Sequence, residues 1–269
     1  MKFDEKAIVI SQNKLSDGIY DMWLETCNIA EYARAGQFVS VYTADPSKLL
    51  PRPISICETD SNRLRLVYRV VGEGTKQFSE YKSGDAVHII GPLGNGYPLG
   101  EARSPILIGG GIGIPPMLEL AKRLRGNIFA ADDMMGDVTE CENISIVLGY
   151  RNADTFLLDD LKVYGDVYIA TDDGSLGIHG TVLDAIKANA VKGDIIYSCG
   201  PTPMLRAVSS YAAGENIKAY LSLEERMACG IGACLACVCK TAGVDEHSQV
   251  HNARICTDGP VFDSREVEL

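Results

Sequence analysis

Short runs of alternating apolar and polar residues dominate the first hundred positions of the chain. They read AIVIS, IYDMWLE, QFVSVYT, LRLVYRVV and DAVHIIG, and turn sequences such as SDG, ARAG and KSGD separate them. Alternation with a period of two is the pattern of a half-buried strand, and several short strands at such intervals are typical of a small barrel. Helical signals are few before EGTKQFSEY. We therefore expect residues 1–100 to form an antiparallel β-barrel.

The pattern changes from about residue 104. The apolar run SPILIGGGIG ends in glycines, and the helix-like IPPMLELAKRLRG follows it. Strand and helix patterns then alternate through ISIVLGYR, DVYIATDDG, TVLDAIKANA, DIIYSCGP and TPMLRAVSSYAAGEN. Such alternation indicates a parallel sheet with helices on both faces, so residues 101–222 are predicted to form a doubly wound α/β domain.

No long apolar period continues beyond about residue 222, where glycine, cysteine and short polar runs take over. A small segment of this kind cannot build much of a core and generally needs a staple. Residues 223–269 are therefore predicted to form a third, small domain. The fold class expected for the 269 residues is therefore multidomain: an antiparallel β-barrel, a doubly wound α/β domain and a small C-terminal domain that needs a stabilising staple.

Composition and charge narrow the functional class. An apolar fraction of 46% and a charged fraction of 23% are those of a soluble globular protein, and no window approaches the roughly eighteen uncharged apolar residues of a membrane span. The N-terminal MKFDEKAIVISQNK has acidic residues where a signal peptide needs an apolar run, so we expect a cytoplasmic, reducing location. The net charge of −11 argues against a nucleic-acid partner.

Nine cysteines are present, and four of them fall in ACGIGACLACVCKT, residues 228–241. A disulfide knot, a zinc site, a redox dithiol and an iron–sulfur cluster would each use such a stretch differently. Clustered cysteines in a reducing compartment usually bind metal or do redox work. The isolated Cys27, Cys57 and Cys141 are predicted to be buried small hydrophobes.

The spacing of Cys229, Cys234 and Cys237, with Cys256 further along, is that of plant-type 2Fe-2S ligation. The glycines between the first two cysteines fit the need for backbone N–H groups to turn toward the sulfurs. A zinc site is the main rival, but it would ordinarily use two C-x2-C pairs, and the chain has one. These four cysteines are the predicted cluster ligands.

Three further residues near the cluster are predicted to be non-ligands. Cys239 follows Cys237 too closely and would point elsewhere in an extended segment. His247 and His251 fall between the third and fourth ligands, but a Rieske-type site needs matched pairs of Cys and His. We interpret both histidines as exposed loop residues.

The glycine run GGGIGIPPM, residues 109–117, follows a predicted strand and opens a predicted helix. A dinucleotide pyrophosphate can lie there against free N–H groups, which makes Gly110, Gly111 and Gly113 candidate contacts. The run does not match G-x-G-x-x-G, so a glycine-rich turn without a ligand remains the alternative. The segment Cys199, Gly200 and Pro201 ends another predicted strand, and ligands of open parallel sheets bind beyond such ends.

The sequence TDDGS, residues 171–175, ends a third strand of the same predicted sheet. Carboxylates suit ribose hydroxyls and repel a 2′-phosphate, so Asp172 favours NADH over NADPH. A solvated acidic turn is the alternative interpretation of Asp172 and Asp173.

In the barrel segment, RPISI at 52–56 places Arg52, with forked donors suited to a pyrophosphate, before Ser55, whose hydroxyl could meet a flavin ring. An Arg-Pro pair before a strand is also an ordinary edge feature. Further on, Arg69 precedes Gly74 and Thr75, which open a helix-like stretch and form a second potential phosphate cradle.

The order of Arg52-Pro53-Ile54-Ser55, Gly74-Thr75, the Gly109–Gly113 run and Cys199-Gly200-Pro201 resembles that of the ferredoxin-NADP reductase superfamily. The resemblance covers residues 1 to about 222 and implies a flavin-binding barrel followed by a nicotinamide-binding α/β domain. It implies that Arg52 binds the FAD pyrophosphate, with Pro53 and Ile54 beside it, and that Ser55 lies near flavin N5. It also implies that Val67, Tyr68 and Arg69 line the flavin, that Gly74 and Thr75 contact its phosphates, and that Cys199 approaches the nicotinamide.

With the C-terminal cysteines included, the whole chain resembles the electron transfer subunits of dihydroorotate dehydrogenase B. The resemblance rests on RPIS, GPLGNGY at 91–97, GGGIG, TDDGS, CGP and ERMACGIGACLACVC, and departures lie mainly in loops such as 127–143. It implies FAD, a 2Fe-2S cluster and NAD as cofactors, and an FMN-containing dihydroorotate dehydrogenase catalytic subunit as partner, with two copies of each chain. Electrons from dihydroorotate would then pass from FMN through the cluster and FAD to NAD+ in pyrimidine biosynthesis, and this chain has no evident dihydroorotate site of its own.

Two alternatives remain open on the sequence. One is a reductase of the same build that serves ferredoxin, sulfide or hydrogenase chemistry. The other is a non-enzymatic, zinc-stapled binding module whose glycine turns hold no ligand.

Overall fold

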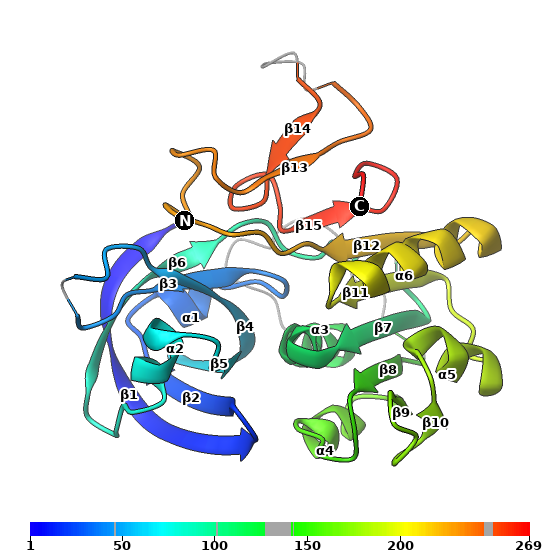
Figure 1. Ribbon diagram of the computed structural model, residues 1–269, viewed down its shortest axis with the longest axis horizontal. Coiled ribbons are helices and arrows are strands. Elements are labelled where there is room, and N and C mark those ends of the chain that lie inside the picture. Colours follow the sequence, from blue (N-terminus) through cyan, green and yellow to red (C-terminus); the bar gives the residue numbers. More distant parts are fainter. Residues whose placement is uncertain (46, 101, 127–140, 142, 245–249) are drawn as a thin grey trace.

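The computed structural model describes residues 1–45, 47–100, 102–126, 141, 143–244 and 250–269. A barrel, an α/β layer and a C-terminal segment follow one another along the chain, and the C-terminal segment lies across the other two (Figure 1). None of the described helices is both long and apolar enough to cross a bilayer.

A closed antiparallel barrel occupies the N-terminal third, and in the described chain its strand order is β1-β2-β5-β4-β3-β6. The strands are β1 (Phe3–Ser16), β2 (Ile19–Glu25), β3 (Phe38–Val41), β4 (Arg52–Asp60), β5 (Arg63–Arg69) and β6 (Ala86–Leu93), and the short helices α1 (Ile29–Tyr32) and α2 (Glu73–Phe78) connect them. Alternation along β5 points Leu64 and Leu66 into the barrel core and Val67 toward the α/β layer. The predicted antiparallel barrel is confirmed.

The second layer is a sheet of order β10-β9-β8-β7-β11-β12-β15 in the described residues, parallel except at β15. Its strands are β7 (Pro105–Gly110), β8 (Ser145–Tyr150), β9 (Asp166–Thr171), β10 (Ile178–His179), β11 (Ile195–Cys199), β12 (Lys218–Ser222) and β15 (Val261–Asp263). Its helices are the 3-10 turn η1 (Gly111–Gly113), α3 (Pro115–Gly126), α4 (Leu158–Lys162), α5 (Val182–Ala188) and α6 (Thr202–Glu215).

Helices cover both faces of this sheet, as the sequence pattern predicts. In the central strand β7, Leu107 packs with α3 and α4 on one face, whereas Ile106 and Ile108 pack with α5 and α6 on the other. A strand buried on both faces is a continuous apolar run, which is why PILI carries no alternation.

The C-terminal segment is not independent of the sheet. Its hairpin of β13 (Val238–Lys240) and β14 (Asn252–Arg254) stands apart, but β15 returns to pair with β12, with Phe262 opposite Leu221. The third unit therefore contributes the edge strand of the second (Figure 1).

Helix α3 joins the barrel to the sheet through buried charges. Glu119 accepts hydrogen bonds from the Thr59 backbone N–H at 2.8 Å and from Arg123 Nε at 2.7 Å, and Arg123 also donates to the Ala33 carbonyl at 2.9 Å. Both charged side chains are almost fully buried. Removing one partner of such a pair leaves an uncompensated buried charge, so this contact fixes how the two domains meet.

The isolated cysteines follow the prediction in two cases. Cys57 and Cys141 are buried, but Cys27 is exposed, so its predicted burial was wrong. Cys27 lies just beyond the end of β2, in a bend whose backbone N–H donates to Glu5 at 2.9 Å. The periodicity of the strand therefore does not extend to this position.

Candidate functional site

The first candidate phosphate site brings together Arg52 and the start of α2. A methyl group added at Gly74 would lie 2.5 Å from Arg52 Nε, so the guanidinium lies directly against the first turn of the helix. Thr75 Oγ1 holds that turn by accepting the backbone N–H groups of Val71 at 2.9 Å and Gly72 at 3.3 Å. The structure thus joins Arg52, Gly74 and Thr75, and the arginine fork supplies the charge for an anionic ligand.

Ser55 lies on the same strand, half-buried and paired with Phe38 of β3, and Pro53 and Ile54 pair with the next residues of that strand. The hydroxyl of Ser55 makes no hydrogen bond within the described residues, which leaves it available to a ligand.

The three residues of β5 predicted to line the flavin differ in exposure. Val67 and Tyr68 are 2% and 1% exposed, and the Tyr68 hydroxyl accepts a hydrogen bond from Gln12 at 2.6 Å inside the barrel. Burial raises the pKa of Tyr68, so the phenol stays neutral. These two residues therefore offer almost no accessible surface to a ligand. Arg69, by contrast, is partly exposed and extends toward Gly111, where an added methyl group would lie 3.5 Å from Arg69 Nη2.

The glycine run meets the end of β11 at the centre of the sheet. Strands β7 and β11 are neighbours, and the chain runs outward from them in opposite directions, so their carboxyl ends form a topological switch point. A methyl group at Gly113 would overlap the carbonyl oxygen of Cys199, and one at Gly110 would lie 2.5 Å from Met204 Sδ. Gly111 has φ +54 and Gly200 has φ +158. Close packing of the two strand ends therefore accounts for much of the glycine requirement, while Pro201 beside them is the N-cap residue of α6.

Cys199 is buried at this junction, facing the barrel. Burial, helped by the charge of Glu224 and opposed by a hydrogen bond with Ser222, raises the pKa of Cys199 to about 12. Tyr97 approaches from the barrel and donates its hydroxyl to the Ser198 carbonyl at 3.1 Å. The thiol is therefore a neutral, packed group at neutral pH.

Several neighbours of Cys199 were missed by sequence reasoning. Tyr97, Met204, Ser222 and Glu224 come from three separate segments; Tyr97 lies in GPLGNGY and Met204 in TPMLRAVSSYAAGEN, but neither is predicted there as a site residue. Glu224 is exposed, but desolvation of its carboxylate by the surrounding protein raises its pKa, and the positive charge of Arg69 acts to lower it.

The acidic turn after β9 lies at the same edge of the sheet. Asp173 accepts the N–H and hydroxyl of Ser175 at 2.9 and 2.6 Å, and these bonds lower the pKa of Asp173. Asp172 is exposed, and in the described chain its carboxylate makes no hydrogen bond or ion pair. Asp172 is thus the carboxylate of this turn that remains available to a ribose.

The cysteine loop has the backbone turns that its glycines predict. Gly230 and Gly232 have φ +68 and +89, and the N–H of Ala233 donates to Cys229 Sγ at 3.3 Å. Although burial acts to raise it, hydrogen bonds from backbone N–H groups of the loop and from Cys234 lower the pKa of Cys229 to about 6. A lowered thiol pKa suits a metal ligand, because the thiolate is the form that binds.

The four predicted ligands interact with one another. Cys229 interacts with Cys234, and Cys256 interacts with both Cys237 and Cys229; burial and the Cys237 contact raise the pKa of Cys256 to about 12. Within the described residues, no three His, Cys, Asp or Glu side chains are arranged to hold one metal ion. Four cysteine sulfurs are the number that a 2Fe-2S cluster takes, two for each iron.

Two of the three predicted non-ligands fall within the described residues. Cys239 sits in β13 opposite Ala253, where burial raises its pKa. His251 is exposed, as predicted, and His247 lies outside the described residues.

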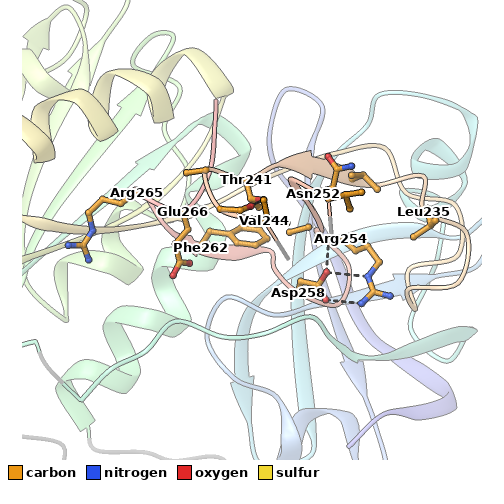
Figure 2. Close-up of a pocket in the computed structure, with 14 residues that line it drawn as sticks. Leu235, Thr241, Val244, Asn252, Arg254, Asp258, Phe262, Arg265 and Glu266 are labelled. Carbon is orange, nitrogen blue, oxygen red and sulfur yellow. Dashed lines mark hydrogen bonds and ion pairs between the residues drawn. The ribbon is translucent and has the colours of Figure 1, made fainter. Parts of the chain in front are cut away.

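A groove of about 800 Å³ lies beside the cysteine loop on the C-terminal segment (Figure 2). Leu235 of the loop stands at one end and Arg265 at the other, and Arg254 pairs with Asp258 across its floor. None of the predicted cofactor residues lines this groove.

A closed antiparallel barrel, a parallel sheet with a crevice at its switch point and a C-terminal cysteine loop define a reductase of the ferredoxin-NADP reductase type with an added iron–sulfur domain. The fold is similar to that of an NADH-dependent reduced ferredoxin-NADP oxidoreductase, with a TM-score of 0.82, 27% sequence identity, and coverage of 98% of this chain and 90% of that one. Residues 224–268 match the family model for the iron-sulfur cluster binding domain of dihydroorotate dehydrogenase B.

Two relatives define the family more narrowly. The chain is 42% identical to the electron transfer subunit of dihydroorotate dehydrogenase B (NAD(+)) from Listeria monocytogenes serotype 4a (strain HCC23), over 97% of both chains. It is 39% identical to the corresponding subunit of Geobacillus thermodenitrificans (strain NG80-2), over 98% of both chains. The chain belongs to the family of dihydroorotate dehydrogenase B electron transfer subunits.

Proposed function

We propose that this chain exchanges electrons between NAD(H) and a catalytic partner through FAD and a 2Fe-2S cluster. The observation that carries the proposal is the meeting of three candidate sites at one end of the barrel. Gly230 of the cysteine loop packs against Ser40 of β3, Ser55 lies on the neighbouring strand β4, and Arg69 extends from β5 to the glycine run. Nicotinamide carries hydride, a cluster carries single electrons, and a flavin exchanges both, so FAD belongs between the other two.

The residues of this chain would bind and orient rather than react. Arg52, Gly74 and Thr75 hold the FAD pyrophosphate, with Ser55 beside the ring. The ends of β7 and β11 receive the nicotinamide, where the neutral Cys199 packs without adding charge. Asp172 meets the adenosine ribose and disfavours a 2′-phosphate.

The partner that we propose is an FMN-containing dihydroorotate dehydrogenase catalytic subunit, two copies of each chain forming a heterotetramer. The relatives' names support a catalytic partner, because they are electron transfer subunits of a dihydroorotate dehydrogenase. The cysteine loop offers the surface for it: Ile231 and Leu235 are 49% and 63% exposed, and no charged residue lies between Arg226 and Lys240. Exposed apolar residues around a redox centre are suited to a protein contact.

We propose a division of labour along the chain that follows the predicted boundaries. Residues 1–100 carry FAD, residues 101–222 carry the nicotinamide, and residues 223–269 carry the cluster. Strand β15 of the last part pairs with β12 and so adds an edge strand to the nicotinamide sheet.

The relay is tested by Cys234→Ser, with Cys239→Ser as the matched control from the same segment. We expect Cys234→Ser to keep FAD and NADH oxidation by an artificial dye, but to lose most electron exchange with the FMN of the partner. Cys239→Ser should keep both, together with its iron. If Cys234→Ser exchanged electrons with the partner at the rate of the unaltered protein, the cluster would not be the exit route.

A further inference from the structure

Asn95 of the GPLGNGY motif binds the C-terminal segment with every polar group of its side chain. Its Nδ2 donates to the carbonyls of Asp258 at 3.1 Å and Val261 at 2.7 Å, and its Oδ1 accepts the Val261 N–H at 2.9 Å. Its backbone N–H also donates to the Gly259 carbonyl at 2.6 Å. A single half-buried residue of the barrel therefore holds three residues of the segment 258–261.

The surrounding contacts leave this segment little freedom. Gly94 has φ +74, and a methyl group there would lie 2.5 Å from Pro260 Cδ. Gln37 of the barrel donates to the Gly94 carbonyl at 2.7 Å, and Leu223 donates its backbone N–H to Pro260 at 2.9 Å. Residues 258–261 are thus held between the barrel and the end of β12.

The held segment is directly connected to a predicted cluster ligand. Cys256 lies two positions before Asp258, and Arg254 closes this turn because its backbone and guanidinium both donate to the Asp258 carboxylate. A displacement of Asp258 therefore moves Cys256.

On the barrel side, the same motif is connected to the candidate flavin site. Leu93 of β6 pairs with Phe38 of β3, and Phe38 pairs with Ser55 of β4. The anchor of the ligand segment thus lies two strands from Ser55, roughly 10 Å at the usual spacing of paired strands.

We propose that Asn95 is a positioning residue, which holds the Cys256 side of the cluster loop at a set distance from the flavin site and thereby sets the rate of electron exchange between them. This inference rests on the proposed function. Asparagine is suited to the role because it supplies two donors and one acceptor, which match two carbonyls and one N–H.

The test compares Asn95→Ala and Asn95→Asp with Asn62→Ala in the holoprotein. Asn95→Asp keeps the shape and the acceptor for Val261 but sets a carboxylate oxygen against the carbonyls of Asp258 and Val261, and so serves as the more disruptive variant. Asn62→Ala removes an exposed hydrogen bond to Glu25 in the turn between β4 and β5 of the barrel. For each variant we measure iron and FAD content, the EPR spectrum of the reduced cluster and NADH oxidation by ferricyanide. We also measure hydrogen exchange of residues 255–263 and single-turnover electron transfer from flavin to cluster.

For both Asn95 variants we expect unchanged cofactor content, EPR spectrum and ferricyanide rate. Hydrogen exchange of residues 255–263 should be about tenfold faster in Asn95→Ala, as loss of a buried hydrogen bond allows, and at least as fast in Asn95→Asp. Transfer from flavin to cluster should slow several-fold in both, and Asn62→Ala should match the unaltered protein.

Two results overturn the inference. Unchanged transfer from flavin to cluster would mean that Asn95 does not set its rate, and loss of iron would mean that Asn95 builds the cluster site rather than placing it. Failure of the proposed function has a different signature, because flavin in the unaltered protein would then be reduced by NADH while the cluster was never reduced.

Discussion

At the scale of single residues, Gly113 combines a packing role with a place in the candidate nicotinamide site. Its Cα faces the backbone of Cys199 and Gly200, and no flexible side chain lies between that could move aside. Any added side chain must therefore separate the ends of β7 and β11. The packing role of the glycine run therefore falls within the candidate nicotinamide site.

We predict that Gly113→Ala lowers the free energy of unfolding by about 1–3 kcal/mol, the usual cost of overpacking, and raises the KM for NADH. Urea unfolding and steady-state NADH oxidation measure the two effects. Gly214→Ala is the control, because nothing lies within 4 Å of a methyl group there and its position in α6 favours alanine. Equal stability of the two variants would contradict the packing role.

The sequence predicts residues of the site where a local motif carries the chemistry. Arg52 stands out for its forked donor groups and Gly74 for its place at the start of a helix, and the structure brings the two residues together. Val67 and Tyr68 share a strand pattern with Arg69, but which of them faces a ligand depends on how the barrel closes. Alternation alone cannot decide that, because both faces of β5 are covered.

At the scale of elements, the strands with strong periodicity are the ones that sequence reasoning finds. Strand β15 has three residues, too few for a period, and its pairing with β12 joins segments that lie far apart in the sequence. Helix α3 was predicted from its pattern, but its contact with the barrel was not. That contact depends on Glu119 and Arg123, which on an isolated helix would be read as an exposed i, i+4 pair.

Glu119→Ala should therefore destabilise the protein strongly, by about 3–5 kcal/mol, because it leaves Arg123 as a buried cation and removes the acceptor of Thr59. Asp17→Ala removes an exposed pair with Lys14 and should change stability by about 0.5 kcal/mol or less. Chemical unfolding of both variants gives the comparison. Similar effects of the two substitutions would show that the α3 contact is not what fastens the domains.

At the scale of the whole molecule, one chain arranges three redox sites by seating the cysteine loop on the barrel and the barrel on the sheet. Motifs in separate segments predict which sites exist. Their mutual placement depends on contacts such as Asn95 with residues 258–261, which link positions more than half the chain apart and leave no local pattern in the sequence.

The central claim is that NADH, FAD and the cluster form one conducting sequence within this chain. The most direct measurement is the EPR spectrum of the purified holoprotein after anaerobic reduction by NADH, with flavin absorbance followed in the same sample. The account predicts that the flavin bleaches and that the signal of a reduced 2Fe-2S cluster appears. A bleached flavin with a cluster that stays oxidised, although dithionite reduces it, would contradict the account.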